Sequence, residues 1–332
     1  MVKLKDVAKA SGMSVTQVSR ALNDYDDVNE ETKARIKAVA KELGYVKNVT
    51  AQKLATGMSN QIAVVIKGLD DYSNLVEYNS IYPILCGVNA YTSKANYEVV
   101  VFILQEEVNS YIRYFKDKGI QQAILFGFDY DDVRFVELIQ SDYTCVCIDI
   151  QIEGRNKGSV ITNNTFYAAQ AVELLFKSGK QNIAMMSGKS HAVVSIEREA
   201  GYRVAVQKHQ QVINEAYILN GEFQEIKARE LMLSLLEEHP EVDGIFCASD
   251  YMALGCMDAI KSVGKKIPDD IAIVGFDNVP VARYVTPSLS TVAQDDYQKG
   301  YKAAELLANI LNKTVENTTV FLECELKIRE SV

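Results

Sequence analysis

Two short amphipathic segments, separated by a glycine, open the chain. Leu4, Val7 and Ala8 recur at the i, i+3, i+4 spacing that gathers apolar side chains on one face of a helix. Gly12 follows this stretch, and glycine is favoured where a helix ends because it tolerates left-handed backbone. The pattern predicts a short helix over residues 4–10 that stops before a tight turn.

The second segment is a predicted helix over residues 15–22. Ser14 precedes it, and Gln17 follows Ser14 at the three-residue spacing of a capping box, in which each side chain bonds the other residue's backbone N–H. Its apolar residues face one side, while Thr16, Gln17 and Arg20 face the other. Two short helices joined by a glycine-containing turn predict a helix-turn-helix, whose second helix enters the major groove of DNA in known examples.

A third helix is predicted between Asn29, a good N-cap residue, and Leu43, with Gly44 as the residue that ends it. The segment 48–57 has residues that favour helix but little apolar surface of its own. Because isolated helices shorter than about 12–15 residues are marginal in water, this segment is expected to fold only against a partner.

From residue 61 onward, apolar runs alternate with amphipathic stretches. Runs that are apolar throughout are typical of parallel strands buried on both faces. The predicted strands are 62–66, 99–104, 123–126 and 145–148, followed by 182–186, 217–219, 244–247 and 271–275. The predicted helices are 81–95, 110–118, 165–178, 198–209, 228–238, 252–263 and 301–311. This order predicts two successive α/β halves, with the helix over 301–311 returning to the first half.

Charge is distributed unevenly along the chain. Residues 1–59 hold eight Lys and two Arg against four Asp and three Glu, a net charge of +3, whereas the whole chain carries −9. The remaining residues therefore carry −12. Positive charge is concentrated where phosphates would be contacted, and an acidic body would be repelled from DNA.

Other global features limit the class of protein. No apolar run approaches the roughly 18–20 residues of a membrane span, and the N-terminus lacks the apolar core of a signal peptide, so a cytoplasmic location is expected. The cysteines are scattered without metal-ligand spacing and are expected to be reduced core thiols. They are Cys86, Cys145, Cys147, Cys247, Cys256 and Cys324.

Three runs of sequence carry a family resemblance. The runs LKDVAKASGMSVTQVSRALN, VNEETKARIKAVAKELGY and NVTAQKLATG, followed by the α/β body, resemble the lactose-repressor (LacI/GalR) family of bacterial transcription regulators over essentially the whole chain. The resemblance implies an all-α helix-turn-helix headpiece and a two-lobed α/β body like that of periplasmic sugar-binding proteins, with parallel sheets and three crossing strands. It implies a homodimer that binds a near-palindromic DNA operator.

The implied domain bounds follow the same pattern. The headpiece takes residues 1–47, and a hinge helix with its linker takes 48–60. The body takes 61–332, with one lobe at about 61–160 plus 291–319 and the other at about 161–290 plus 320–332.

Family positions in the second helix assign the contacts with bases. Arg20 can donate two hydrogen bonds to a guanine edge, Thr16 can contact either kind of base pair, and Val15 can make only apolar contact. A nonspecific phosphate contact is the alternative for Arg20. The other predicted DNA-binding residues, most of them expected on the DNA backbone, are Lys5, Ser14, Gln17, Ser19, Asn23, Asn48 and Ala51.

Leu54 in the hinge segment is expected to insert into the minor groove at the operator centre, as the equivalent leucine does in the family. Packing against the body is the alternative for this side chain. The family usually has a proline just before the hinge asparagine, whereas Val46 and Lys47 precede Asn48 here. Without the fixed φ of proline, the backbone at the start of the hinge is less constrained. This departure puts the affinity for operator DNA in doubt and leaves the expected mechanism unchanged.

Polar residues that follow predicted strands assign the effector site, because open α/β sheets bind ligands at the carboxyl ends of their strands. Arg198, in an R-x-x-G-Y pattern, and Asp277, in VGFDN, match the effector-binding arginine and aspartate of the family. A structural ion pair is the alternative for this pair. Asp250 is interpreted mainly as the N-cap of a helix that begins at Tyr251.

Further effector contacts rest on weaker matches. Ser249 stands where many relatives carry Asn, and Phe223 stands where relatives place an aromatic ring that stacks on a sugar, with a plain core role as the alternative. Lys67 could face the cavity, although a solvated lysine is the preferred interpretation. The loosest assignments are Asp149, Thr162, Asn163 and Gln294. The acidic and aromatic stretch 70–82 is either a wall for a larger sugar or a solvated loop.

The resemblance implies a repressor of carbohydrate-utilisation genes. A sugar or sugar phosphate between the lobes would change their angle, the spacing of the hinge helices and hence operator affinity. The direction of this change, and a dimer against a higher assembly, stay open. One alternative is a family member controlled by a phosphoprotein partner, and another is a sugar-binding protein without DNA function.

An enzyme is not expected, since the three His are not in nucleophile or metal-ligand spacing and no P-loop, GxSxG or GxGxxG motif is present. Neither a metal nor a cofactor is expected.

Overall fold

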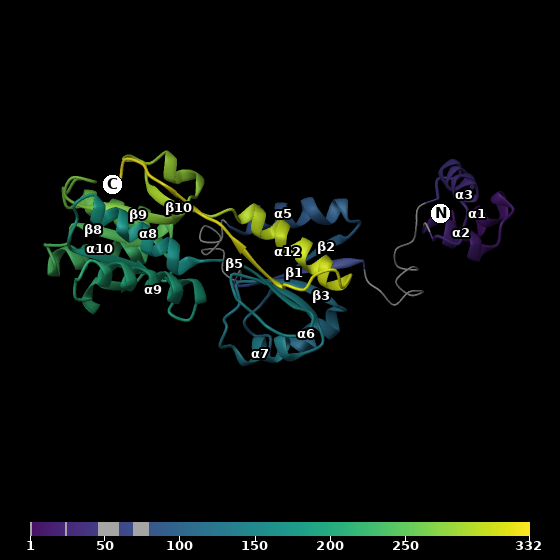
Figure 1. The fold of residues 1–332 in the computed structure, drawn as a ribbon, viewed down its shortest axis with the longest axis horizontal. Coiled ribbons are helices and arrows are strands. Elements are labelled where there is room, and N and C mark those ends of the chain that lie inside the picture. Colours follow the sequence, from purple (N-terminus) through teal and green to yellow (C-terminus); the bar gives the residue numbers. More distant parts are fainter. Residues whose placement is uncertain (1, 24, 46–59, 69–79) are drawn as a thin grey trace. The chain divides into compact units, whose positions relative to one another are not determined.

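The computed structural model describes residues 2–23, 25–45, 60–68 and 80–332 (Figure 1). The chain divides into two compact units, residues 1–60 and 61–332. Among the sequence-based assignments, Asn48, Ala51, Leu54 and most of the 70–82 stretch lie outside the described residues. No helix in the described ranges is long and apolar enough to cross a membrane.

The described part of the first unit contains three helices, which are α1 (Leu4–Ser11), α2 (Val15–Leu22) and α3 (Glu30–Glu42). Val7, Val18 and Ile36, one from each helix, are fully buried against one another in its small core. Gly12 ends α1 in the left-handed conformation with φ 69°. The predicted capping box is present, since the Gln17 backbone N–H donates to Ser14 Oγ at 3.2 Å.

Two six-stranded sheets form the second unit. The first has the order β11-β5-β4-β3-β1-β2 and is parallel throughout, and the second has the order β12-β10-β9-β8-β6-β7 with only β12 antiparallel. The first-sheet strands are β1 (Gln61–Lys67), β2 (Glu98–Leu104), β3 (Gln122–Phe126), β4 (Thr144–Ile148), β5 (Lys157–Thr162) and β11 (Thr319–Leu322). The second-sheet strands are β6 (Ile183–Ser187), β7 (Ile218–Asn220), β8 (Gly244–Cys247), β9 (Ala272–Asp277), β10 (Ser290–Ala293) and β12 (Glu325–Lys327).

Helices cover both faces of the first sheet. Its helices are α5 (Ile81–Lys94), α6 (Tyr111–Lys118), α7 (Val133–Gln140) and α12 (Asp296–Leu311). Along β1, Ile62, Val64 and Ile66 pack toward α5 and α12, whereas Ala63 and Val65 pack toward α6 and α7 (Figure 1). Both faces of this strand are therefore buried, which explains why its sequence is apolar throughout and confirms the predicted parallel α/β class.

Four helices belong to the second sheet, and they are α8 (Asn164–Lys177), α9 (Val193–Lys208), α10 (Glu225–Glu238) and α11 (Asp250–Ser262). α8 packs beside α9, and α10 packs beside α11. Between residues 80 and 332 the chain passes between the sheets three times, after β5, after β10 and after β11 (Figure 1). Helix α12 packs on α5 of the first lobe, as predicted for the helix that returns there.

Several predicted element bounds were wrong. Arg198 does not open its helix, because α9 begins five residues earlier at Val193 after Ala192, an N-cap residue whose side chain makes no capping bond. Helix α12 begins at Asp296 and not at 301, with the Asp295 side chain accepting from the Gln298 backbone N–H at 2.9 Å. Helix α7 and the strands β11 and β12 were not predicted. Short edge strands and helices without a marked start give weak sequence signals.

Candidate functional site

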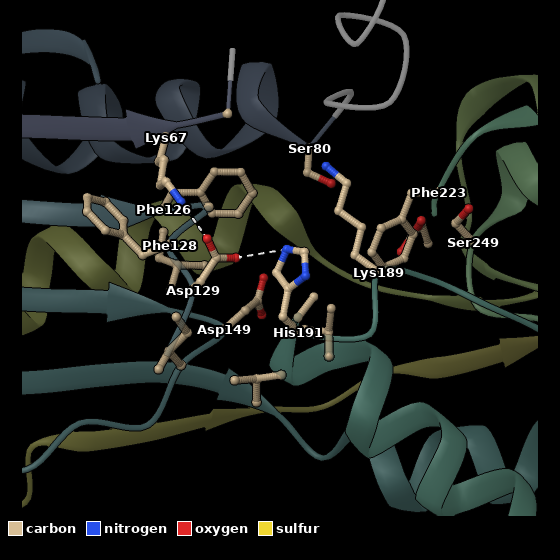
Figure 2. A pocket seen from close by; sticks show the side chains of 18 of the residues that line it. Lys67, Ser80, Phe126, Phe128, Asp129, Asp149, Lys189, His191, Phe223 and Ser249 are labelled. Carbon is tan, nitrogen blue, oxygen red and sulfur yellow. Dashed lines mark hydrogen bonds and ion pairs between the residues drawn. The ribbon is translucent and has the colours of Figure 1, made fainter. Parts of the chain in front are cut away.

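A cavity of about 250 Å³ lies at the carboxyl ends of strands from both sheets. Its lining includes Lys67 at the end of β1, Asp149 after β4, Ser249 after β8 and Asp277 at the end of β9. Figure 2 shows side chains from both lobes that point into this space. The position agrees with the general rule that open parallel sheets bind ligands at these strand ends.

Arg198 is held at the second-lobe side of the cavity by several partners. Its Nε donates to Asn164 Oδ1 at 3.0 Å and one terminal nitrogen donates to the Ala248 carbonyl at 2.6 Å. The guanidinium carbon lies 3.7 Å from the centre of the Phe276 ring. Only 4% of Arg198 is exposed, so the charged group is held in a single position beside the cavity.

Asp277 lies 3.7 Å from Arg198, measured from Oδ1 to Nη1, which is longer than a direct hydrogen bond. The same oxygen accepts from Gln294 Nε2 at 2.8 Å. Burial raises the pKa of Asp277 to about 6, although the charge of Arg198 opposes the shift. Its backbone has φ 109°, an unusual value for a side-chain-bearing residue, so this carboxyl is placed at a strained position.

Lys299 continues this chain of contacts into the first lobe. Its Nζ donates to Gln294 Oε1 at 2.7 Å and lies 2.8 Å from Asp149 Oδ1. Burial acts to lower the pKa of Lys299, but the carboxylates of Asp149 and Asp296 outweigh it and raise the pKa. The amino group is therefore charged, and its charge is matched by carboxylates. Sequence reasoning missed Lys299, because nothing in α12 marks one lysine as buried.

For Lys67 the preferred interpretation was wrong, and the alternative, that it faces the cavity, is confirmed. It is 6% exposed and lines the cavity, whereas the sequence suggested a solvated lysine. Burial acts to lower its pKa, but the hydrogen bond to Asp129 and three nearby carboxylates raise it. Nε2 of His191, from the second lobe, lies 3.3 Å from Asp129 Oδ1 (Figure 2). Asp129 thus contacts one nitrogen-bearing side chain from each lobe, Lys67 and His191.

Most of the assigned effector residues come together at this cavity. The assigned residues among its lining are Arg198, Asp277, Ser249, Phe223, Asp149 and Gln294. Thr162 and Asn163 are not among the lining residues. Thr162 is buried in β5, and Asn163 is exposed and caps α8 by accepting from the Phe166 backbone N–H at 3.0 Å. The neighbouring Asn164 is the residue that contacts Arg198.

The interpretation of Asp250 as an N-cap was wrong. Ser249 caps α11 by accepting from the Met252 backbone N–H at 3.3 Å, and Asp250 is the first helical residue. Asp250 is fully buried and accepts from the Val279 backbone N–H at 2.8 Å and from Thr291 Oγ1 at 2.6 Å. Its bonds tie the end of β9 to β10, and burial raises its pKa well above the usual range.

Phe223 combines the two roles that the sequence left open. Its ring packs against the core of the second lobe and also lines the cavity (Figure 2). The ring lies over Gly188, where an added Cβ would come within 2.1 Å of Cζ. Gly188 therefore allows the close approach that places the aromatic face at the cavity.

The first unit presents the predicted DNA-facing residues on the outer face of α2. Val15, Thr16, Gln17 and Arg20 are exposed, and 40% of Val15 is accessible. Arg20 is paired within the headpiece, since one Nη lies 2.7 Å from Asp27 Oδ2 and the guanidinium lies 4.9 Å from the Tyr25 ring centre. Lys5 is exposed, and Ser19 and Asn23 are half-buried.

Comparison with known proteins places both units in one family. Residues 3–48 match the model of bacterial regulatory proteins of the lacI family, and residues 172–332 match the periplasmic binding protein-like domain. The chain is 31% identical to the ribose operon repressor of Halalkalibacterium halodurans, over 100% of this chain and 97% of that protein. It is 29% identical to the probable HTH-type transcriptional repressor ExuR of Bacillus subtilis, over 100% and 98%.

Solved structures agree with this placement. The transcriptional regulator CelR in complex with cellobiose is 27% identical, with a TM-score of 0.75 and full coverage of both chains. The lac repressor dimer bound to operator, at 24% identity and a TM-score of 0.82, shares the fold over 99% of this chain and 98% of that chain. The chain belongs to the lacI family of bacterial regulatory proteins. It is a DNA-binding transcriptional repressor and not an enzyme, as the sequence predicted.

Proposed function

We propose that this repressor controls carbohydrate-utilisation genes and that a small sugar-type effector, bound in the cavity of the body, changes its affinity for operator DNA. The observation that carries this proposal is the series of ion pairs and hydrogen bonds that links Arg198, Asp277, Gln294, Lys299 and Asp149 along the cavity. Each sugar hydroxyl both donates and accepts, so a wall of carboxylate, amide and guanidinium groups suits it.

The cavity also offers an aromatic face. The ring of Phe223 lies beside Ser249 across the cavity from the first-lobe residues (Figure 2). An apolar wall with a few oriented polar groups is the usual design of a small-molecule site. The volume of about 250 Å³ lies below the roughly 300–1,000 Å³ of drug-sized ligand sites, which favours a compact effector over a long oligomer.

Relatives support a carbohydrate class without naming one sugar. CelR was solved in complex with cellobiose, and another relative represses a ribose operon. Cellobiose is a disaccharide and ribose is a monosaccharide, so these relatives do not fix the size of the effector. The argument for its size therefore comes from the cavity of this chain.

The series of contacts also suggests how binding is transmitted. Arg198 and Asp277 belong to the second lobe, Lys299 and Asp149 belong to the first, and Gln294 follows the crossing strand β10. A ligand that bonds to both ends of this series stabilises one angle between the lobes over others, and a difference in affinity between two states is what shifts an equilibrium. In a homodimer with hinges at about 48–60, this angle would set the spacing of two headpieces on a near-palindromic operator.

A binding screen tests this proposal. The full-length protein is heated with mono- and disaccharides, and operator DNA is obtained by selection from a random near-palindromic library. A ligand at 100 times its Kd is expected to add about 2.7 kcal/mol to the free energy of unfolding and to change operator affinity.

Matched variants locate the site. Phe223→Ala is expected to weaken binding of the sugar, whereas Phe166→Ala, which removes a half-exposed ring of α8 outside the cavity, is expected to bind as the wild type does. If no sugar, charged or neutral, stabilises the protein and a phosphoprotein partner alone changes operator affinity, the proposal is wrong. The alternative of control by a phosphoprotein would then hold.

A further inference from the structure

One cation in the cavity lining differs from the others. Lys67, Arg198 and Lys299 each lie within ion-pair distance of at least one carboxylate. Lys189, in the loop between β6 and α9, lines the same cavity and is half-buried. Within the described ranges, no carboxylate lies within ion-pair distance of its amino group. Glu222 is near enough for a Coulombic interaction with Lys189, but its direct partner is Lys227, at 2.8 Å. A half-buried ammonium without a direct carboxylate partner favours a negatively charged group from outside the chain.

His191 adds a second donor on the same loop. Lys189 and His191 both project into the cavity, and the ring of His191 lies toward Asp129 (Figure 2). Asp129 also binds Lys67, so the Asp129 carboxylate has two nitrogen partners. The loop therefore presents two nitrogen donors to the cavity, and only that of His191 lies within ion-pair distance of a described carboxylate.

The start of α9 contributes in the same direction. The N-cap residue Ala192 has no side-chain acceptor for the first N–H groups of the helix, and Ala192, Val193 and Val194 line the cavity. The first N–H groups of a helix have no partner within it, and they carry the positive end of its dipole. This 16-residue helix therefore adds positive electrostatic potential beside the loop that carries Lys189 and His191.

We infer that the effector is an acidic sugar, whose carboxylate or phosphate binds Lys189, His191 and the first turn of α9. Its ring hydroxyls then contact the series from Arg198 to Asp149, with Phe223 against the ring. Charge-assisted hydrogen bonds from a lysine and an imidazole to an anion are roughly twice as strong as neutral ones. This inference rests on the proposed function and specifies the ligand class of the same cavity.

Calorimetric titration of the full-length protein tests the inference with three groups of probes. They are hexuronates, hexose 6-phosphates and the matching neutral hexoses, each in the gluco, galacto and manno configurations. At least one acidic probe is expected to bind ten or more times as tightly as its neutral counterpart, with an affinity that falls as salt rises. The uronates and the phosphates distinguish the two sources of the anion.

Lys189→Met keeps the aliphatic stem and removes the charge. It is expected to lower the affinity for the acidic sugar at least tenfold and to leave the affinity for a neutral sugar unchanged. The matched control is Lys177→Met, which removes an exposed lysine of α8 outside the cavity and is expected to change neither affinity.

Two results overturn the inference, and they are distinct from failure of the proposed function. A neutral sugar that binds as tightly as its acidic counterpart, or an acidic sugar whose Kd is unchanged in Lys189→Met, leaves a sugar-binding cavity but refutes the anion contact. Absence of binding by every acidic and neutral probe refutes the proposed function together with the inference.

Discussion

Two arginines, one in the headpiece and one in the body, are held in different ways. Arg20 pairs with Asp27, seven residues along the chain, and 44% of its side chain is exposed. Arg198 is 5% exposed at its side chain, and its partners Asn164 and Ala248 lie 34 and 50 residues away. Because an exposed ion pair contributes little to stability, Arg20 can leave Asp27 for a DNA partner at a small cost in free energy. Arg198 is buried, so loss of its partners would destabilise the fold itself.

Removal of the buried arginine is expected to have the largest effect. Arg198→Met leaves Asp277 and the Ala248 carbonyl without a charged partner, and breaking a buried charge pair costs about 3–5 kcal/mol. Calorimetric unfolding of the body should show this loss. Arg20→Met is the control, since it removes an exposed arginine and should change stability by no more than about 0.5 kcal/mol. Equal effects of the two changes would remove the distinction between the two arginines.

The pH dependence of stability sharpens the same contrast. Because burial raises the pKa of Asp277 to about 6, from a usual value of 3.8, the folded state binds this proton more tightly than the unfolded state. The resulting stability is present below about pH 4 and is lost as pH rises through about 6, by roughly 3 kcal/mol at most. Asp277→Asn lacks this loss.

Chemical denaturation of the wild type and of Asp277→Asn at pH 4 and pH 7 measures this difference. The wild type should lose stability relative to the variant between these two values. A constant difference would show that the carboxyl of Asp277 has the same pKa in the folded and unfolded states, so that burial does not raise it.

The exposed arginine is expected to affect DNA binding and not stability. Arg20→Met should weaken binding to an operator that contains the contacted guanine by about 1–3 kcal/mol. Fluorescence anisotropy against operators with single substitutions provides the measurement. A loss that is equal for every sequence would assign Arg20 to a phosphate, which is the alternative interpretation.

The smallest effect is expected at the helix cap of the headpiece. Ser14→Ala removes the acceptor for the Gln17 backbone N–H and should destabilise α2 by about 1 kcal/mol. Amide hydrogen exchange of α2 in the full-length protein reports this change, with Ser19→Ala in the same helix as control. The body should exchange at its original rate, because the headpiece is a separate compact unit.

Features that depend on near neighbours in sequence could be predicted. The box formed by Ser14 and Gln17, the cap at Asn29 and the left-handed Gly12 each involve residues within a few positions of a helix end. Continuous apolar runs identified the buried strands, because a strand covered on both faces has no polar side. The start of α9 was missed because Ala192 provides no capping side chain.

The cavity is formed by residues that are far apart in the sequence, and the sequence predicted its lining residues only in part. The family pattern identified Arg198 and Asp277, but it selected the exposed Asn163 where the next residue, Asn164, faces Arg198. A shift of one position moves a side chain about 100° around a helix, so a motif does not decide which of two neighbours faces inward. Lys299 gave no signal, because its partner Asp149 lies 150 residues away.

The sequence by itself therefore determined the class of each unit, the helix-turn-helix and two charged residues that line the cavity, Arg198 and Asp277. These features follow from periodicity, caps and motifs that are local in the chain. Only the tertiary structure decided that Lys67 and Lys299 are buried and paired with carboxylates, whereas Lys189, in the same cavity, has no described carboxylate within ion-pair distance. The reason is physical: the charge state and the availability of a side chain depend on its burial and on its partners, and the fold brings those partners from distant parts of the chain.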